Sequence, residues 1–125
     1  MIKFVKCKHC GNVVEFINDS GVPIMCCGER MEELKANTTD AAQEKHVPVA
    51  ILDGNTLHVE VGSTLHPMTK EHLIQQIIVV NGKRIDKVVL DDSVPPIADF
   101  TVNPTKDIEV YAYCNLHGLW KVDVK

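Results

Sequence analysis

From residue 47 onward, apolar and polar residues alternate in short stretches. The stretch TLHVEV, residues 56–61, is the clearest case, because Leu57, Val59 and Val61 fall on one face of an extended chain. Such alternation indicates a β-strand with one buried face. The second part of the chain is therefore expected to form antiparallel sheets.

The same pattern predicts further strands, separated by turn signals such as Asp53-Gly54-Asn55 and Asn81-Gly82. No stretch has the length and periodicity of a long helix. Many short strands with frequent turns favour an antiparallel β-sandwich of immunoglobulin-like architecture. Seven strands are expected, at residues 47–52, 56–61, 73–80, 85–90, 97–102, 108–113 and 119–124.

The first part of the chain follows a different pattern. Residues 1–36 hold four of the five cysteines and only short apolar clusters. A segment this small cannot bury much of a core, so a metal would have to hold it together. Residues 37–45, NTTDAAQEK, are polar and predict a linker with room for one short helical turn. We therefore expect a small metal-binding module, residues 1–36, and a β domain, residues 37–125.

Composition and charge narrow the class of protein. Hydrophobic residues make up 45% of the 125 residues and charged residues 24%, which is typical of globular proteins. The net charge of −4, without a block of Lys and Arg, argues against a nucleic-acid partner. No apolar run approaches the roughly 20 residues that span a membrane, and no secretory signal is visible. We expect a cytoplasmic protein, in which clustered cysteines favour metal over disulfides.

The first candidate site is a set of four cysteines. Cys7 and Cys10 form a C-x-x-C motif, and Cys26 and Cys27 are adjacent. Four thiolates make a tetrahedral site typical of zinc or iron. Adjacent Cα atoms lie about 3.8 Å apart, so the second pair should distort that tetrahedron. Spacing alone does not separate iron from zinc, and a redox dithiol or a vicinal disulfide are further interpretations.

The fifth cysteine has a histidine as its neighbour. Cys114 and His117 are three residues apart, on a turn marked by Asn115 and Gly118. A cysteine and a histidine so spaced can bind one metal from adjacent directions. The alternative is a buried core cysteine on a strand. The residues themselves leave both interpretations open.

The other histidines differ in their surroundings. His46 lies where the polar linker meets the first strand, and His66 and His72 bracket a loop. Each of the three would singly be more often structural than a metal ligand. His58 shares the polar face of its strand, and His9 lies between two cysteines, so both are expected to face solvent.

Together these motifs resemble desulfoferrodoxin, the two-iron form of superoxide reductase. The resemblance covers nearly the whole chain and is carried by CKHCG, MCCGE, EKHVPV, LHPMTKEH and YCNLHGLW, in the family's order. It implies iron in both sites, a desulforedoxin-like first module and a seven-stranded immunoglobulin-like catalytic domain.

The resemblance also implies roles for individual residues. A tetrathiolate iron would be held by Cys7, Cys10, Cys26 and Cys27. A catalytic iron would have four equatorial histidines and one axial cysteine, namely His46, His66, His72, His117 and Cys114. Glu44 and Lys45 match a glutamate–lysine pair beside the open coordination position.

The implied activity is reduction of superoxide to hydrogen peroxide, with the iron re-reduced by rubredoxin or a similar small donor. A homodimer is implied as well. A non-enzymatic electron-transfer iron protein is the main alternative; a zinc-stapled binding module and a dismutase are two others. One departure from the family is visible in HLIQQI, residues 72–77, where Leu73 and Gln76 stand in a segment that often holds tryptophans. This leaves the ligand set intact but could change the packing behind His72.

Overall fold

The computed structural model describes residues 2–124, which form two compact units with the boundary between Lys35 and Ala36. The boundary lies one residue before the position that the sequence predicts. Nearly all regular structure in the described residues is β-strand, with a single short helix. The expected mainly β fold is confirmed. Among the described residues, no helix has the length and apolar character that crossing a membrane requires.

The first unit consists of short strands. Its main sheet has the order β2-β1-β5, and a second hairpin pairs β3 with β4. Its described core is small: the buried apolar side chains are Phe4, Val5, Cys7 and Met31, and Phe16, Ile24 and Cys26 pack against the last three. So small a core supplies little of the free energy that folding needs. The strands are β1 Phe4–Lys6, β2 Val13–Glu15, β3 Met25–Cys26, β4 Glu29–Arg30 and β5 Glu32–Glu33.

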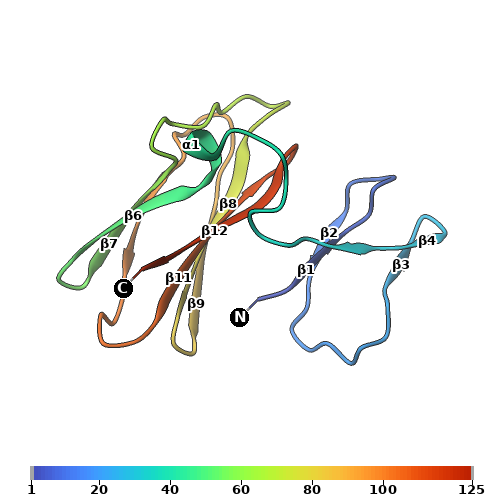
Figure 1. The fold of residues 1–125 in the computed structure, drawn as a ribbon, viewed down its shortest axis with the longest axis horizontal. Helices are drawn as coiled ribbons and strands as arrows, with labels where there is room; N and C mark the ends of the chain where they lie inside the picture. Colours follow the sequence, from blue (N-terminus) through green and yellow to red (C-terminus); the bar gives the residue numbers. More distant parts are fainter. Residues whose placement is uncertain (1, 125) are drawn as a thin grey trace. The chain divides into compact units, whose positions relative to one another are not determined.

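The second unit is a β-sandwich. One sheet has the order β10-β7-β6 and the other β12-β11-β8-β9, and every strand pair is antiparallel. Its seven strands begin and end within one residue of the predicted positions. Figure 1 shows how they are arranged. The strands are β6 Pro48–Asp53, β7 Thr56–Val61, β8 Ile74–Asn81, β9 Arg84–Val89, β10 Ile97–Thr101, β11 Ile108–Cys114 and β12 Gly118–Val124.

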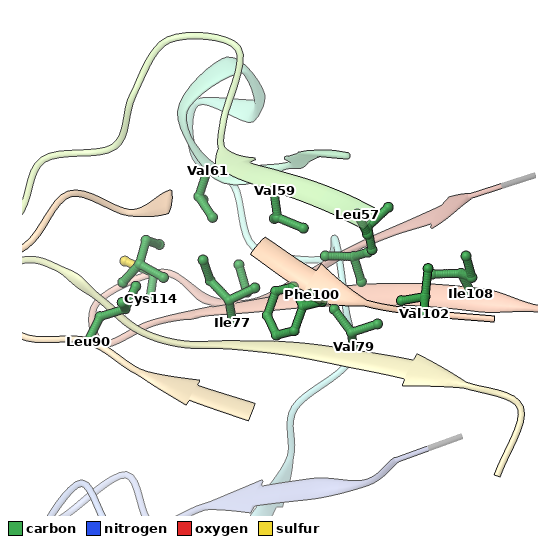
Figure 2. Close-up of a cluster of buried hydrophobic side chains, with 13 residues drawn as sticks. Leu57, Val59, Val61, Ile77, Val79, Leu90, Phe100, Val102, Ile108 and Cys114 are labelled. Carbon is green, nitrogen blue, oxygen red and sulfur yellow. The ribbon is translucent and has the colours of Figure 1, made fainter. Parts of the chain in front are cut away.

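The two sheets share one apolar core. Leu57, Val59 and Val61 of β7 are fully buried, as their alternation predicts, and they face Ile77 and Val79 of β8 (Figure 2). Each such side chain contributes about 1.5–3 kcal/mol when it is buried completely. The sandwich therefore has a core that does not depend on a metal.

The linker is attached to the sandwich before it reaches the first strand. Asn37 donates from its backbone N–H to Leu119 O at 3.0 Å. Its side chain exchanges two hydrogen bonds with the backbone of Lys121, at 3.1 and 2.8 Å. The linker then forms α1, Gln43–His46, which is the predicted helical turn. This course delivers α1 to the end of the sandwich where β6 begins (Figure 1).

Shortening a core side chain should destabilise the sandwich. We expect Ile77→Val, at a fully buried position, to lower the free energy of unfolding by about 0.5–1.5 kcal/mol. The matched control is Ile51→Val on β6, where the side chain is 57% exposed and the change should stay within about 0.5 kcal/mol. Urea unfolding at equal metal loading, followed by Trp120 fluorescence, measures both. Equal losses would contradict this core assignment.

His58 should make stability depend on pH. Hydrogen bonds from its ring to Glu60 at 2.9 Å and Asp99 at 2.5 Å raise its pKa above the ordinary ~6.5. The protonated ring therefore stabilises the fold below about pH 6.5, and this stabilisation is lost as pH rises through the raised pKa. We expect His58→Gln to lose more stability relative to wild type at about pH 6 than at about pH 9. Denaturant titrations showing the same difference at both pH values would refute this.

Candidate metal centres

The first centre is a cluster of four cysteine sulfurs. The sulfurs of all four predicted cysteines lie within 4.8 Å of one another: Cys7, Cys10, Cys26 and Cys27. No disulfide joins any of them. Cys7 is buried, whereas Cys10 and Cys27 are exposed, so the cluster lies at the surface of the first unit.

Backbone turns aim these sulfurs at one point. Gly11, at φ +83°, closes the first turn by donating to Cys7 O at 2.9 Å, and Cys10 N–H points at the Cys7 sulfur at 3.5 Å. In the second turn, Cys27 and Gly28 both have left-handed backbones, with φ of 52° and 75°. For a residue other than glycine this conformation is uncommon. It lets two adjacent cysteines present their sulfurs to the same side.

The thiols of Cys7 and Cys27 differ strongly in pKa. The backbone N–H of Cys10 lowers the pKa of Cys7 to about 6. Hydrogen bonding to Cys10 and Cys7 raises the pKa of Cys27 to about 12. Four thiolates this close repel one another, and a bound cation removes that repulsion. The cluster therefore suits a thiophilic metal such as iron or zinc.

His9 belongs to the surroundings of this cluster. Its Nε2 lies 2.8 Å from Glu29 Oε2, and Lys8 Nζ lies 3.3 Å from the same oxygen. The ring is thus engaged with the opposite turn and is half exposed, in agreement with its expected place at the surface.

The second centre collects side chains from separate parts of the sandwich. His46 ends α1, His66 lies in the loop after β7, and His72 precedes β8. Cys114 ends β11, and His117 lies in the turn to β12. The structure thus brings all five predicted residues to one end of the sandwich.

The four imidazole rings stand around a square. Neighbouring ring centroids lie 4.6 Å apart for His46 and His66, 4.5 Å for His66 and His72, 5.0 Å for His72 and His117, and 4.9 Å for His46 and His117. Neighbouring rings are nearly perpendicular, at 77–84°. His46 and His72 lie across the diagonal, 6.3 Å apart. Such an arrangement offers four nitrogens to one central ion.

Backbone carbonyls fix the tautomer of two of these rings. His46 Nδ1 donates to Ala42 O at 2.6 Å, and His66 Nδ1 donates to Pro67 O at 2.7 Å. Because a carbonyl can only accept, each Nδ1 carries the hydrogen and each Nε2 has a free lone pair. The two Nε2 atoms lie 3.2 Å apart. Lone pairs that face each other repel, and a cation bound by both would turn that repulsion into attraction.

The surroundings of His72 also indicate a bound cation. Its Nε2 is buried and has no hydrogen-bond partner among residues 2–124. A buried polar atom without a partner costs about 1–3 kcal/mol. A metal ion would bind this nitrogen, so the residues of the site fit a metal.

The sulfur of Cys114 lies beside the imidazoles. It is 3.5 Å from His66 Nε2 and 3.9 Å from His117 Nδ1. Cys114 is also fully buried and belongs to the apolar core, at one end of the cluster in Figure 2. Both interpretations of this cysteine therefore hold: its strand position is that of a core residue, and its sulfur faces the histidines.

Burial favours the neutral form of His46, His66 and His72. It lowers the pKa of His66 to about 4, and it also lowers the pKa of His46 and of His72. Neutral imidazole is the form that binds metals. Trp120 adds to the burial, since its ring lies 4.9 Å from the His46 ring and its Nε1 donates to His117 O at 3.0 Å.

Glu44 and Lys45 are exposed in α1, directly before the buried His46. After burial and the neighbouring histidines, the charge of Lys45 also lowers the pKa of His46 and of His72, whereas the charge of Glu44 raises the pKa of His46, so both charges act on the cluster. The carbonyl of Glu44 accepts hydrogen bonds from Thr64 N–H at 2.9 Å and Ser63 Oγ at 3.2 Å.

Gly62, which no motif in the sequence singled out, lets α1 pack closely against the loop after β7. A Cβ at Gly62 would lie 2.6 Å from Glu44 O and 2.9 Å from Val47 O. Only glycine therefore lets α1 approach the loop after β7. Its sole signal in the sequence is a glycine directly after an alternating strand.

Both units of the chain are similar to known proteins. The family model "Desulfoferrodoxin" matches residues 38–123, and "Desulfoferrodoxin, N-terminal domain" matches residues 2–34. A desulfoferrodoxin of Clostridium acetobutylicum is 48% identical over 117 residues, which is 94% of this chain and 92% of the relative.

Solved structures show the same likeness. The crystal structure of the superoxide reductase from Treponema pallidum is similar with a TM-score of 0.77 and 31% identity, covering 98% of each chain. A superoxide reductase (1Fe-SOR) from Giardia intestinalis, at a TM-score of 0.60 and 32% identity, covers 66% of this chain and 98% of its own. The family match spans both units, and the chain therefore belongs to the desulfoferrodoxin family.

Proposed function

We propose that this protein is a superoxide reductase. Superoxide takes up one electron and two protons and leaves as hydrogen peroxide. The observation that carries the proposal is the square of imidazoles with one cysteine sulfur beside it. The similarity to superoxide reductases from Treponema pallidum and Giardia intestinalis supports it.

Both clusters match the iron centres of the desulfoferrodoxin family. We propose that the catalytic iron is held by His46, His66, His72, His117 and Cys114. Bound there, iron would supply the electron and a coordination position for superoxide. Three of the imidazoles are kept neutral by burial, and Cys114 contributes the only anionic ligand. The ligand set therefore carries a single negative charge and offers little repulsion to an anionic substrate.

Lys45 and Glu44 have different tasks in this proposal. Lys45 attracts superoxide, because a local cation on a protein of net charge −4 concentrates an anion where the field is positive. Glu44 lies next to it and is exposed to solvent. Since a site that admits a diffusing substrate also admits water, we assign proton delivery to water. Glu44 is proposed as a carboxylate that could bind the iron when no substrate is there.

The remaining parts of the proposal concern partners and the first unit. We propose that rubredoxin or a similar small electron carrier restores the electron, that the protein is a homodimer, and that it works in the cytoplasm. For the tetrathiolate iron, held by Cys7, Cys10, Cys26 and Cys27, we propose a structural role. The small core of the first unit supports this role, because metal binding can supply the folding free energy that the core lacks.

Product stoichiometry tests the activity. With a small electron donor present, we expect one hydrogen peroxide for each superoxide and no oxygen. Cys114→Ser should lower turnover by at least ~10–100-fold, the loss typical when hydrogen-bond partners of metal ligands are removed. It should also remove the thiolate-to-iron charge-transfer absorption of this centre. Evolution of oxygen would indicate a dismutase, and an iron-loaded protein that leaves superoxide unconsumed would indicate a pure electron carrier.

Removing the charge of Lys45 should slow substrate capture. We expect Lys45→Ala to lower the rate constant by roughly two- to tenfold at low ionic strength and to weaken its salt dependence. Lys83→Ala, in the turn between β8 and β9, is the matched control and should leave the rate unchanged. Pulse radiolysis over a series of salt concentrations measures both. Capture rates equal to wild type in Lys45→Ala would remove this residue from the mechanism.

A further inference from the structure

The four histidines of the catalytic centre are not held in the same way. Carbonyls of the chain hold the rings of His46 and His66 at Nδ1. No such bond orients the ring of His72 among residues 2–124, and its Nε2 is buried without a partner. Contacts with the His66 and His117 rings help to place this ring, and the rest depends on the backbone that carries it.

That backbone forms a tight turn. His72 N–H donates to Thr69 O at 3.2 Å and to Thr69 Oγ1 at 3.1 Å, and Thr69 N–H donates to His72 O at 3.0 Å. These bonds give the turn its shape, but they lie within it. They do not fix where the turn stands relative to Cys114 and His117.

The pairing of β11 with β8 brings Cys114 next to Ile74, and one side chain adds a direct connection to the turn itself. Asn115 Oδ1 accepts the backbone N–H of Leu73 at 3.0 Å, and Asn115 Nδ2 donates to Glu71 O at 2.9 Å. The two bonds grip the residues on either side of His72. The backbone N–H of Asn115 adds a third bond, to Leu73 O at 3.2 Å. The turn that carries His72 is thus clamped from both sides.

The position of Asn115 along the chain shows which parts of the site its hydrogen bonds connect. Asn115 directly follows Cys114 and lies two residues before His117. Its side chain therefore joins the turn that carries two of the five proposed ligands to the turn that carries a third. An amide is suited to this task, because it offers one acceptor and one donor at the same time.

We propose that Asn115 is a positioning residue that sets the place of His72 relative to Cys114 and His117. The inference rests on the proposed metal site. Asn115 acts through the backbone of Glu71 and Leu73 and does not itself bind the metal. Partners that orient metal ligands typically contribute 10–100-fold to metal affinity.

Iron affinity tests the proposal. Competition between the full-length protein and an iron(II) chelator measures affinity, and absorption after oxidation follows each centre separately. We expect Asn115→Ala to weaken iron binding at the histidine–cysteine centre by about 10–100-fold. Occupancy of the tetrathiolate centre should stay unchanged and is the internal control. Asn103→Ala is the matched control, because Asn103 makes similar side-chain bonds to Thr105 in another loop of the sandwich. Unchanged iron affinity in Asn115→Ala would overturn the proposal.

A double variant separates positioning from general destabilisation. If Asn115 acts through His72, Asn115→Ala should have no further effect on iron affinity in a His72→Ala background. If the full 10–100-fold loss persists there, Asn115 acts on its own turn, and the proposal is wrong. If His72→Ala alone leaves iron affinity unchanged, the ligand assignment under the proposed function fails first. The two failures are therefore distinguishable.

A milder variant covers the case in which Asn115→Ala does not fold. Asn115→Asp keeps an acceptor for Leu73 N–H but loses the donor to Glu71 O. We expect weaker iron binding together with preserved protection of the Leu73 amide in hydrogen exchange. Wild-type iron affinity in this variant would overturn the proposal.

Discussion

Unprotonated nitrogens and a sulfur that converge on one point repel one another unless a positive charge lies between them. In this chain the convergence is built in, because carbonyls of Ala42 and Pro67 hold the hydrogens of His46 and His66 on the far side of each ring. The two remaining lone pairs face each other at 3.2 Å. Folding therefore brings these lone pairs together, and a bound cation would turn their repulsion into attraction.

The sandwich is what allows this crowding. The proposed ligands of the catalytic centre lie at the ends of α1 and β11, in the loop between β7 and β8, and in the turn between β11 and β12. A core shared by both sheets fixes those ends. The ligands come from positions 46 to 117, so no local segment could assemble the site on its own. Apolar packing elsewhere in the unit stabilises the fold against the repulsion between the ligands.

Much of the fold could be predicted from the sequence, because alternation and turn residues are local signals. The strand TLHVEV is an example, since the burial of Leu57, Val59 and Val61 follows its pattern. The tetrathiolate cluster was also visible from spacing. For Cys114, the residues left two interpretations open, and only the family resemblance favoured a ligand. The reason is physical: a strand-end cysteine that borders both a core and a metal site has the local pattern of either.

Other features could not be predicted, because they depend on what lies across from a residue in space. Gly62 matters through a carbonyl 18 positions earlier in the chain. Asn115 matters through backbone groups more than 40 positions away. Similarly, the left-handed backbone of Cys27 has no signal in its residue type, because cysteine has no preference for that conformation.

The difference in core size between the two units has a consequence for a cell short of iron. The sandwich buries a continuous apolar core and would stay folded while waiting for its ion. The first unit buries far fewer apolar side chains and would lose its fold when its ion leaves. Scarcity would thus produce a half-folded chain whose catalytic half can be refilled at once, while the other half must fold again around each new ion.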